Sequence, residues 1–278
     1  MFDTMMAKEK KALSGEDAML QGRAALVTGS TSGIGLAIAE ALAAKGSQIM
    51  MNGFGDIDEI EDMRFTMAKR HNVEVQYSGA DLTESDQIEG LVDDTVSAFG
   101  SLDILVNCAG IQIIAPIDEF PVDGWDAMIA IHLSATFHTT RLVLPHMKER
   151  HWGRIVNMGS AHGLVASPYK APYVAAKHGV VGLTKATAIE AGPWEITCNA
   201  ICPGFVKTPM YDLQAEDLAA QEGREVEDFI QEQVSTRHAL PHIISVEEIA
   251  GTVLFLCSDT GRSVTGTALS VDGGWTAT

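Results

Sequence analysis

The chain reads Thr28-Gly29-Ser30-Thr31-Ser32-Gly33-Ile34-Gly35 between a short apolar run, residues 24–28, and an alanine-rich helical pattern, residues 36–45. Glycines let a backbone turn tightly and approach a pyrophosphate, whose charge lies against the free amides of a helix N-terminus. The order of strand, turn and helix distinguishes a dinucleotide-binding turn from glycines that serve only packing. The residues expected to contact a dinucleotide here are Gly29, Thr31, Gly33, Ile34 and Gly35.

Six further apolar runs alternate with helical patterns along the rest of the chain. They cover residues 48–52, 73–77, 104–107, 154–158, 197–201 and 268–271. Seven strands separated by helices imply right-handed crossovers and a parallel sheet covered on both faces. Because no Pro/Gly/Ser-rich linker divides the chain, we predict one doubly wound α/β domain, residues 21–278, after an N-terminal extension, residues 1–20.

One acidic segment, Tyr211 to His238, interrupts the alternation with a helix-forming sequence. It follows the sixth predicted strand, and open α/β sheets bind ligands beyond the carboxyl ends of their strands. We therefore expect a helical lid over the ligand site, at about residues 206–238.

The charge balance limits the choice of partner. The 278 residues carry 19 Lys plus Arg and 37 Asp plus Glu, a net charge of −18, which repels nucleic acid and anionic lipid. The four cysteines lack the spacing of a metal site or a disulfide framework, so we expect free thiols, no bound metal and a reducing compartment. No apolar run resembles a signal peptide or a membrane span, which predicts a cytoplasmic protein.

The choice of dinucleotide depends on nearby cations, because a 2′-phosphate needs arginine or lysine. None stands at residues 29–35 or 52–56, which favours NAD, although the ribose-binding carboxylate usual for NAD is also absent from Asn52-Gly53-Phe54. Asp81-Leu82, after the third predicted strand, is placed to meet an adenine. An acid in the first turn of a helix is a nearly equal alternative for Asp81.

A serine, a tyrosine and a lysine indicate chemistry on alcohols or carbonyls. Ser160 follows the fifth predicted strand, Tyr173 comes thirteen residues later, and Lys177 lies four residues further on the same helix face. An ammonium beside the phenol favours its ionised form, which matters because a tyrosine with a pKa of about 10 is a poor base at neutral pH. A tyrosine and a lysine at this spacing are common, but here they accompany the glycine turn, Asn107-Cys108-Ala109-Gly110 and Pro203-Gly204.

Together these motifs resemble the short-chain dehydrogenase/reductase family from Leu20 to the end of the chain. The resemblance implies a Rossmann-type fold in which Tyr173 is the acid/base, Ser160 polarises the carbonyl, and Lys177 binds the nicotinamide ribose and lowers the tyrosine pKa. It also implies cofactor contacts from Phe54, Asp81, Leu82, Asn107, Gly110, Pro203, Gly204, Val206 and Thr208. The segment Val271 to Trp275 resembles the family's last strand and subunit contact, and members are usually homotetramers.

Within the family, the stretches Ser160-Ala161-His162-Gly163-Leu164-Val165 and Tyr173-Val174-Ala175-Ala176-Lys177-His178-Gly179 resemble those of bacterial members that oxidise D-3-hydroxybutyrate. In those enzymes a glutamine after the fourth strand, a histidine two residues beyond the serine, a lysine three residues before the tyrosine, and a glutamine in the lid hold the substrate carboxylate. The matching residues are Gln112, His162, Lys170 and Gln214. One ammonium and several hydrogen-bond donors suit a small carboxylate. Taken singly, a lysine before a helix is usually solvated and an amide in an acidic insertion usually lies at the surface, but the four matches together favour the substrate interpretation.

Two positions depart from that pattern. His132 replaces the family's catalytic asparagine, and either its backbone carbonyl still holds a proton-relay water, which we favour, or its imidazole titrates and adds a pH dependence. Phe205 replaces a tryptophan that caps the substrate, so the apolar wall is kept but leaves more room. The preference between four- and five-carbon acids is therefore open.

The sequence as a whole predicts an NAD-dependent dehydrogenase that interconverts D-3-hydroxybutyrate and acetoacetate. One alternative is another reductase of the family, such as an NADPH-dependent 3-oxoacyl carrier-protein reductase. The missing cations near Asn52 and the acidic surface, which would repel an acidic carrier, disfavour it. The other alternative is a non-catalytic nucleotide sensor, which the intact Ser160, Tyr173 and Lys177 disfavour.

Overall fold

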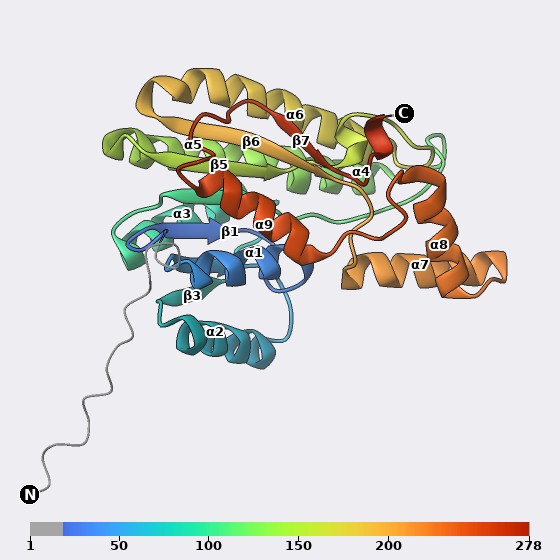
Figure 1. The fold of residues 1–278 in the computed structure, drawn as a ribbon, viewed down its shortest axis with the longest axis horizontal. Helices are drawn as coiled ribbons and strands as arrows, with labels where there is room; N and C mark the ends of the chain where they lie inside the picture. Colours follow the sequence, from blue (N-terminus) through green and yellow to red (C-terminus); the bar gives the residue numbers. More distant parts are fainter. Residues whose placement is uncertain (1–18, 278) are drawn as a thin grey trace, which may run out of the picture.

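The structure, a computed structural model, describes residues 19–277 (Figure 1). The expected N-terminal extension, residues 1–20, therefore lies outside the described residues except for its last two. Leu20 is buried, and its amide donates to the Lys45 carbonyl at 2.9 Å. This end of the expected extension consequently packs as part of the domain.

Seven parallel strands form one sheet in the order β3-β2-β1-β4-β5-β6-β7, which confirms the predicted fold class. The strands are β1 (Ala24–Val27), β2 (Gln48–Asn52), β3 (Val75–Ser78), β4 (Ile104–Asn107), β5 (Gly153–Met158), β6 (Ile196–Pro203) and β7 (Ala268–Val271). Each differs from its predicted range by at most two residues at either end. The order reverses direction between β1 and β4, so a crevice for a ligand opens at the carboxyl ends of these two strands.

Helices cover both faces of the sheet, as Figure 1 shows. They are α1 (Gly33–Ala44), α2 (Ile57–His71), α3 (Ser85–Phe99), α4 (Val122–Ile129), α5 (Ala135–Arg150), α6 (Ala171–Ala191), α7 (Pro209–Glu222), α8 (Val226–Arg237) and α9 (Val246–Cys257). Successive strand residues point to opposite faces. Val27 and Val106 pack in the core beside α1 and α9, whereas Leu26 and Leu105 pack in the core beside α3 and α5. No helix in residues 19–277 is long and apolar enough to cross a bilayer.

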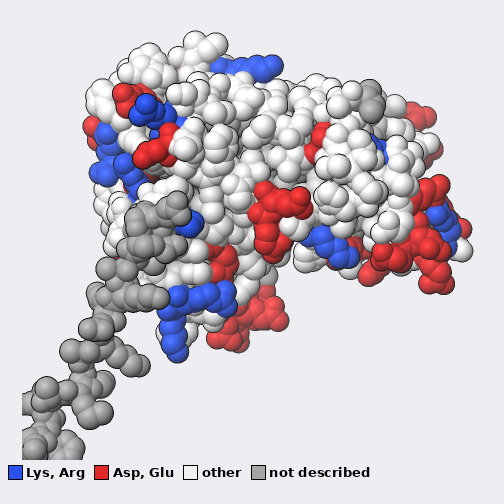
Figure 2. Space-filling view, viewed as in Figure 1, with Lys and Arg blue, Asp and Glu red and all other residues white. Residues whose placement is uncertain are grey.

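The acidic segment after β6 is helical and forms α7 and α8. These helices have a small core of their own, which includes Ala219, Phe229 and Val234, and Phe205 and Tyr211 pack against it. Many of the acidic side chains gather on the outer surface of this pair (Figure 2). The pair begins just beyond the carboxyl end of β6, so it lies at the edge of the sheet where the crevice opens.

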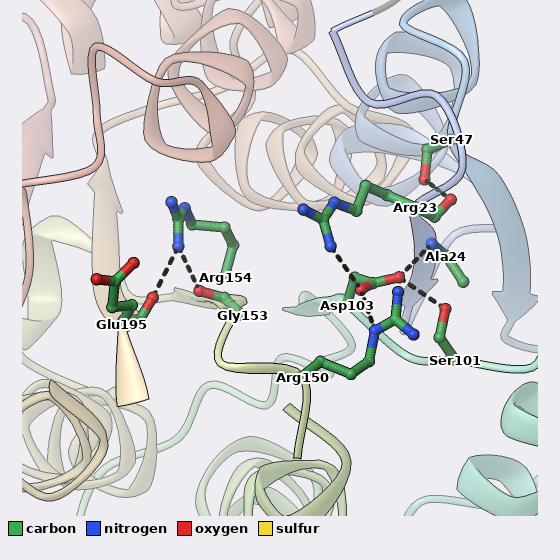
Figure 3. A network of polar contacts seen from close by, with 9 residues as sticks. All are labelled: Arg23, Ala24, Ser47, Ser101, Asp103, Arg150, Gly153, Arg154 and Glu195. Carbon is green, nitrogen blue, oxygen red and sulfur yellow. Dashed lines mark hydrogen bonds and ion pairs between the residues drawn. The ribbon is translucent and has the colours of Figure 1, made fainter. Parts of the chain in front are cut away.

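The opposite edge of the sheet holds a buried carboxylate, that of Asp103 (Figure 3). It accepts hydrogen bonds from Arg23 and Arg150, both at 3.0 Å, from the Ser101 hydroxyl at 2.7 Å and from the Ala24 amide at 3.0 Å. These partners stand just before β1 and β4 and at the end of α5. The network therefore ties two central strands and a covering helix together at their amino-terminal side.

Candidate active site

A pocket of about 400 Å³ lies at the carboxyl ends of the central strands, beside α7. Residues predicted to bind the dinucleotide that line this pocket are Gly29, Thr31, Gly33, Ile34, Gly35, Phe54, Leu82, Gly110, Pro203, Gly204, Val206 and Thr208. Residues predicted for catalysis or substrate binding that line it are Gln112, His132, Ser160, His162, Lys170, Tyr173, Lys177, Phe205 and Gln214. The fold therefore brings nearly all the predicted site residues into one cavity.

The glycine-rich turn has the shape of a phosphate cradle. A Cβ on Gly35 would lie 2.1 Å from the Gly29 carbonyl oxygen, and Gly29 has a φ of +64° and would carry a Cβ 2.7 Å from the Ala109 Cα. Only glycine fits at either position. The Ser32 side chain does not cap the first turn of α1, so amides of that turn remain available to an anion.

The end of β2 offers nothing that would bind a 2′-phosphate. Asn52 is buried, and its side-chain amide donates to the carbonyls of Ser78 and Ala80 at 3.1 and 3.0 Å. Among the described residues, the only lysines or arginines that line the pocket are Lys170 and Lys177. Lys170 directly precedes α6 and Lys177 lies within it, so neither belongs to β2 or to the turn that follows β2. The pocket wall in this region is made of neutral groups, including the exposed ring of Phe54.

Two residues expected to contact the cofactor have side chains that form hydrogen bonds with other residues of the protein. The Asp81 carboxylate accepts from the amide and the hydroxyl of Thr83, at 2.9 and 2.8 Å, just ahead of α3, which matches the helix-turn alternative. Asn107 donates to Asn157 at 2.9 Å and accepts from Thr139 at 2.7 Å, and so connects β4 to β5 and α5. The structure places neither residue in the pocket wall.

Ser160, Tyr173 and Lys177 come together as predicted from their spacing. Ser160 precedes a short 3-10 helix, η2 (Ala161–Gly163), and makes a hydrogen bond with Tyr173. The Lys177 Nζ lies 5.5 Å from the centroid of the Tyr173 ring and donates to the Met158 carbonyl at 2.6 Å. A phenol, a hydroxyl and a buried ammonium therefore face one cavity.

The direction of the Tyr173 pKa differs from the expectation. Burial raises this pKa above its ordinary value, and the hydrogen bond with Ser160 lowers it by less. The Lys177 ammonium, which was expected to lower it, is directed to the Met158 carbonyl instead. Burial also lowers the pKa of Lys177 to about 8, because a charged ammonium loses its hydration there.

His132 lies in a π-helical turn, η1 (Ala130–Ser134), between α4 and α5. Its buried ring meets the Tyr173 ring edge to face at 5.1 Å, and its Nε2 lies 2.8 Å from the Ile111 carbonyl oxygen. Its Nδ1 has no hydrogen-bond partner within residues 19–277. Burial and the Lys177 charge lower its pKa to about 3, which favours a neutral imidazole over the alternative of a titrating group.

The four residues expected to hold a carboxylate all line the pocket, and the Lys170 charge acts on His162. Burial, followed by the charge of Arg237, lowers the pKa of Lys170 to about 8. His162 contacts the Ser167 hydroxyl at 2.7 Å, and burial, Lys170 and Arg237 lower its pKa to about 4. The end of the pocket around Lys170 and His162 therefore combines one desolvated ammonium with neutral hydrogen-bonding groups.

Trp275 is a pocket residue that the sequence interpretation assigned to the last strand and a subunit contact. That assignment is wrong for the strand, because β7 ends at Val271. The Asp272 carboxylate accepts from the amides of Gly274 and Thr276 at 3.0 Å and turns the chain back. The Trp275 ring then lies 5.0 Å from Phe205 and 5.1 Å from His162, and it lines the pocket. The paired glycines before it were the available signal for this turn.

The chain is similar in sequence to known oxidoreductases over nearly its whole length. A family model described as "Enoyl-(Acyl carrier protein) reductase" matches residues 29–276. The D-beta-hydroxybutyrate dehydrogenase of Cupriavidus necator is 49% identical over 93% of this chain and 100% of its own length. That of Rhizobium meliloti is 46% identical over 92% and 99%. The chain belongs to the short-chain dehydrogenase/reductase family. It is therefore an oxidoreductase.

Solved structures of the family agree with the fold. Carveol dehydrogenase from Mycobacterium avium, in complex with NAD, is similar with a TM-score of 0.87, 29% identity, and coverage of 94% of this chain and 100% of that one. L-sorbose reductase from Gluconobacter frateurii, complexed with NADPH and L-sorbose, gives a TM-score of 0.89 at 29% identity, over 94% and 99%. Of these two structures with the same fold, one therefore binds NAD and the other binds NADPH.

Proposed function

We propose that this protein is an NAD-dependent dehydrogenase that interconverts D-3-hydroxybutyrate and acetoacetate. The observation that carries the proposal is Lys170, a desolvated ammonium with no carboxylate partner within residues 19–277, in the same pocket as Tyr173. An anionic substrate group would neutralise this charge. The identity of 46–49% to two D-beta-hydroxybutyrate dehydrogenases supports the same substrate.

The cradle at Gly29 and Gly35 fits a dinucleotide, and the neutral wall around Phe54 suits the unphosphorylated ribose of NAD. When bound, NAD supplies the acceptor for a hydride from carbon 3 of the acid. The amides in the first turn of α1, which the Ser32 side chain does not cap, would hold the pyrophosphate.

In the oxidative direction, Tyr173 acts as a base in its phenolate form, so it first gives up its own proton to solvent and its oxygen then takes the proton of the substrate hydroxyl. The Ser160 hydroxyl donates to the same substrate oxygen as it becomes a carbonyl oxygen. Lys177, on the face of α6 that carries Tyr173, has its Nζ 5.5 Å from the Tyr173 ring centroid. Its positive charge would stabilise the phenolate if the Nζ turned from the Met158 carbonyl toward the phenol oxygen. Lys170, with Gln112, His162 and Gln214, holds the carboxylate away from the reacting carbon.

His132 acts in this scheme through packing, because its neutral ring fixes the edge of the Tyr173 ring. The proton-relay water expected at its carbonyl would share that oxygen with the Thr136 hydroxyl, which already donates to it at 2.8 Å.

We also propose that the protein works as a cytoplasmic homotetramer. Large apolar side chains stay exposed on α4, α5 and α6, namely Trp125, Phe137 and Ile189. Contact between copies would cover such a surface. Light scattering at micromolar concentration tests this, and a mass of one chain would contradict it.

The proposed activity is tested by steady-state turnover with D-3-hydroxybutyrate, its methyl ester and 3-oxoacyl thioesters, each with NAD and NADP. We expect the free acid with NAD to give the highest kcat/KM. A preference for thioesters with NADP would favour the carrier-protein reductase alternative, which a 34% identical Staphylococcus aureus 3-oxoacyl-[acyl-carrier-protein] reductase keeps open. Binding of NAD without turnover of any substrate would favour the sensor alternative.

A further inference from the structure

The last residue of α8, Arg237, lies against the aromatic wall of the pocket. Its guanidinium carbon is 5.3 Å from the centroid of Trp275 and 5.7 Å from that of Phe205, and both rings line the cavity. The Arg237 Nη1 also donates to the Gln233 side chain at 2.5 Å, one turn back on the same helix. The lid therefore places a further positive charge behind the aromatic wall of the pocket, in contact with the two rings.

The next residue, His238, fixes where this charge lies. Its Nε2 accepts from the Phe205 amide at 3.2 Å, and its ring stacks on the Phe205 ring at 5.4 Å and 24°. The same ring fills space that side chains would occupy at two turns, since a Cβ on Gly204 or Gly273 would lie 2.6 or 2.8 Å from it. The end of α8 is thus wedged between the turn after β6 and the turn after β7.

The Arg237 charge acts on the substrate end of the cavity. It is among the groups that lower the pKa of both Lys170 and His162 and of the Tyr211 hydroxyl from what burial alone would give. Within residues 19–277 no carboxylate lies at ion-pair distance from Arg237. Besides Lys177 next to Tyr173, two cations without a carboxylate partner, Lys170 and Arg237, consequently act on the substrate end of this largely apolar pocket in a protein with a net charge of −18.

We propose that Arg237 is a specificity-determining positioning residue. It stacks on Phe205 and Trp275, fixes the wall of the pocket and, together with Lys170, selects a substrate that carries a carboxylate over a neutral carbonyl compound. An anion in the pocket relieves the repulsion between the two cations, whereas a neutral ligand leaves it in place. The inference deepens the proposed function and rests on it for the identity of the acid, but not for the preference for an anion.

The test compares Arg237→Gln with Arg237→Lys and with Arg224→Gln. Arg224 is a lid arginine paired with Glu222 and Glu232, so its replacement controls for lid folding and net charge. Isothermal titration calorimetry with the NAD-loaded protein measures acetate as an inert carboxylate probe and acetone as its neutral counterpart. For Arg237→Gln we expect acetate to bind about five- to ten-fold more weakly and acetone unchanged. Arg237→Lys should recover part of the loss, and Arg224→Gln should match wild type.

The pH dependence of acetate binding separates charge from packing. The charged or titratable groups that act on this end of the pocket are Lys170, His162, Tyr211, Arg237, His178 and Asp212, and the last of these is paired with Lys207. In wild type, acetate affinity should fall as pH rises through about 8, where Lys170 loses its proton. Removing the neighbouring charge raises the Lys170 pKa, so in Arg237→Gln the fall should begin at higher pH.

Equal losses for acetate and acetone, with an unmoved pH profile, would show that Arg237 only packs, and would overturn the inference. Unchanged acetate affinity in Arg237→Gln would overturn it as well. Failure of wild type to oxidise D-3-hydroxybutyrate would instead overturn the proposed function. The acetate measurement would still decide whether Arg237 selects anions, because it needs no turnover.

Discussion

The buried carboxylate at the amino-terminal ends of the strands has partners of opposite charge, whereas the desolvated ammonium groups at the carboxyl ends of the strands have none among the described residues. At the amino-terminal edge, the Asp103 carboxylate is fully buried and accepts hydrogen bonds from two arginines, a hydroxyl and an amide (Figure 3). At the carboxyl-terminal edge, Lys170 and Lys177 are desolvated with no carboxylate beside them, and the His132 Nδ1 is buried without a partner within the described residues.

The difference shows which edge is built for stability and which for a ligand. A buried charge with a complete set of partners is tolerated and connects the elements around it. A buried polar group without partners costs free energy, so it persists where the fold places it for another purpose. Among the described residues, two of the four buried side-chain atoms without a partner, the His132 Nδ1 and the Tyr211 hydroxyl, line the pocket, whereas the Thr140 Oγ1 and the Arg154 Nε do not. The two ammonium groups without a carboxylate, Lys170 and Lys177, both line the pocket, and they indicate that the carboxyl-terminal edge is the binding edge.

The largest expected effect is at the carboxyl-terminal edge. Tyr173→Phe removes the acid/base group and should reduce kcat by about 100- to 10,000-fold, while NAD binding and the unfolding midpoint stay near wild type. Stopped-flow NADH formation and fluorescence titration of NADH measure these quantities. Turnover within ten-fold of wild type would mean that another group moves the proton.

Asp103→Ala tests the opposite edge. Removing the carboxylate leaves two arginines without their partner, and because both are partly exposed we expect a loss of about 2 to 4 kcal/mol in the free energy of unfolding. The KM values for acid and cofactor should stay unchanged. Urea denaturation measures the loss, with Asp93→Ala, an exposed acid on α3, as the control. If Asp103→Ala changed KM and left stability intact, the contrast between the edges would be wrong.

The features that could be predicted from the sequence also differ between the two edges. Strands and the cofactor turn could be predicted because apolar runs and glycines act locally, and the catalytic trio could be predicted from motif spacing. Asp103 gave no signal, since its partners Arg23 and Arg150 are distant in the chain. Arg237 was missed for the same reason, because long-range packing brings it to the pocket wall. Trp275 was assigned to the last strand, although the paired glycines before it indicated the local turn that brings it to the pocket. The direction of the Tyr173 pKa could not be read from the i and i+4 spacing, which does not show that Lys177 donates to Met158.

Lys170→Ala should reduce kcat/KM for the acid by about ten- to a hundred-fold through KM, because a charge-assisted contact contributes roughly 1.5 to 3 kcal/mol. The KM for NAD should be unaffected. Lys185→Ala provides the control, since Lys185 is exposed on the same helix. In wild type the carboxylate contact is present below the Lys170 pKa of about 8 and is lost as the pH rises above it. An unchanged KM for the acid in Lys170→Ala would place the carboxylate elsewhere.

His132→Asn should have a smaller effect. The variant loses the edge-to-face contact with Tyr173, which is worth about 0.5 to 1.5 kcal/mol, so kcat should fall by roughly two- to ten-fold. Because the wild-type imidazole has a pKa of about 3, the profile of kcat against pH between 5 and 9 should keep the same number of ionisations. An ionisation near pH 6 that disappears in the variant would show that His132 titrates during turnover.

The smallest effect is expected at Phe205, which forms the alkyl wall together with Trp275 and stacks on His238. A phenyl ring in place of the family's indole leaves room for about one more methylene, and a buried methylene contributes about 0.8 kcal/mol, or a factor of roughly four. The wild type should therefore accept 3-hydroxyvalerate with only a small penalty. Phe205→Trp should increase the preference for the four-carbon acid by about that factor.

The measurement is the ratio of kcat/KM for the four- and five-carbon acids in both proteins. The added indole has to fit between the rings of His238 and Trp275, so a lid that no longer closes would lower kcat/KM for both acids alike. Only a change in the ratio reports on the alkyl wall. If the ratio stayed the same while the activity remained high, Phe205 would not contact the methyl end. Chain length would then be determined by Trp275 or Tyr211, which line the same part of the pocket.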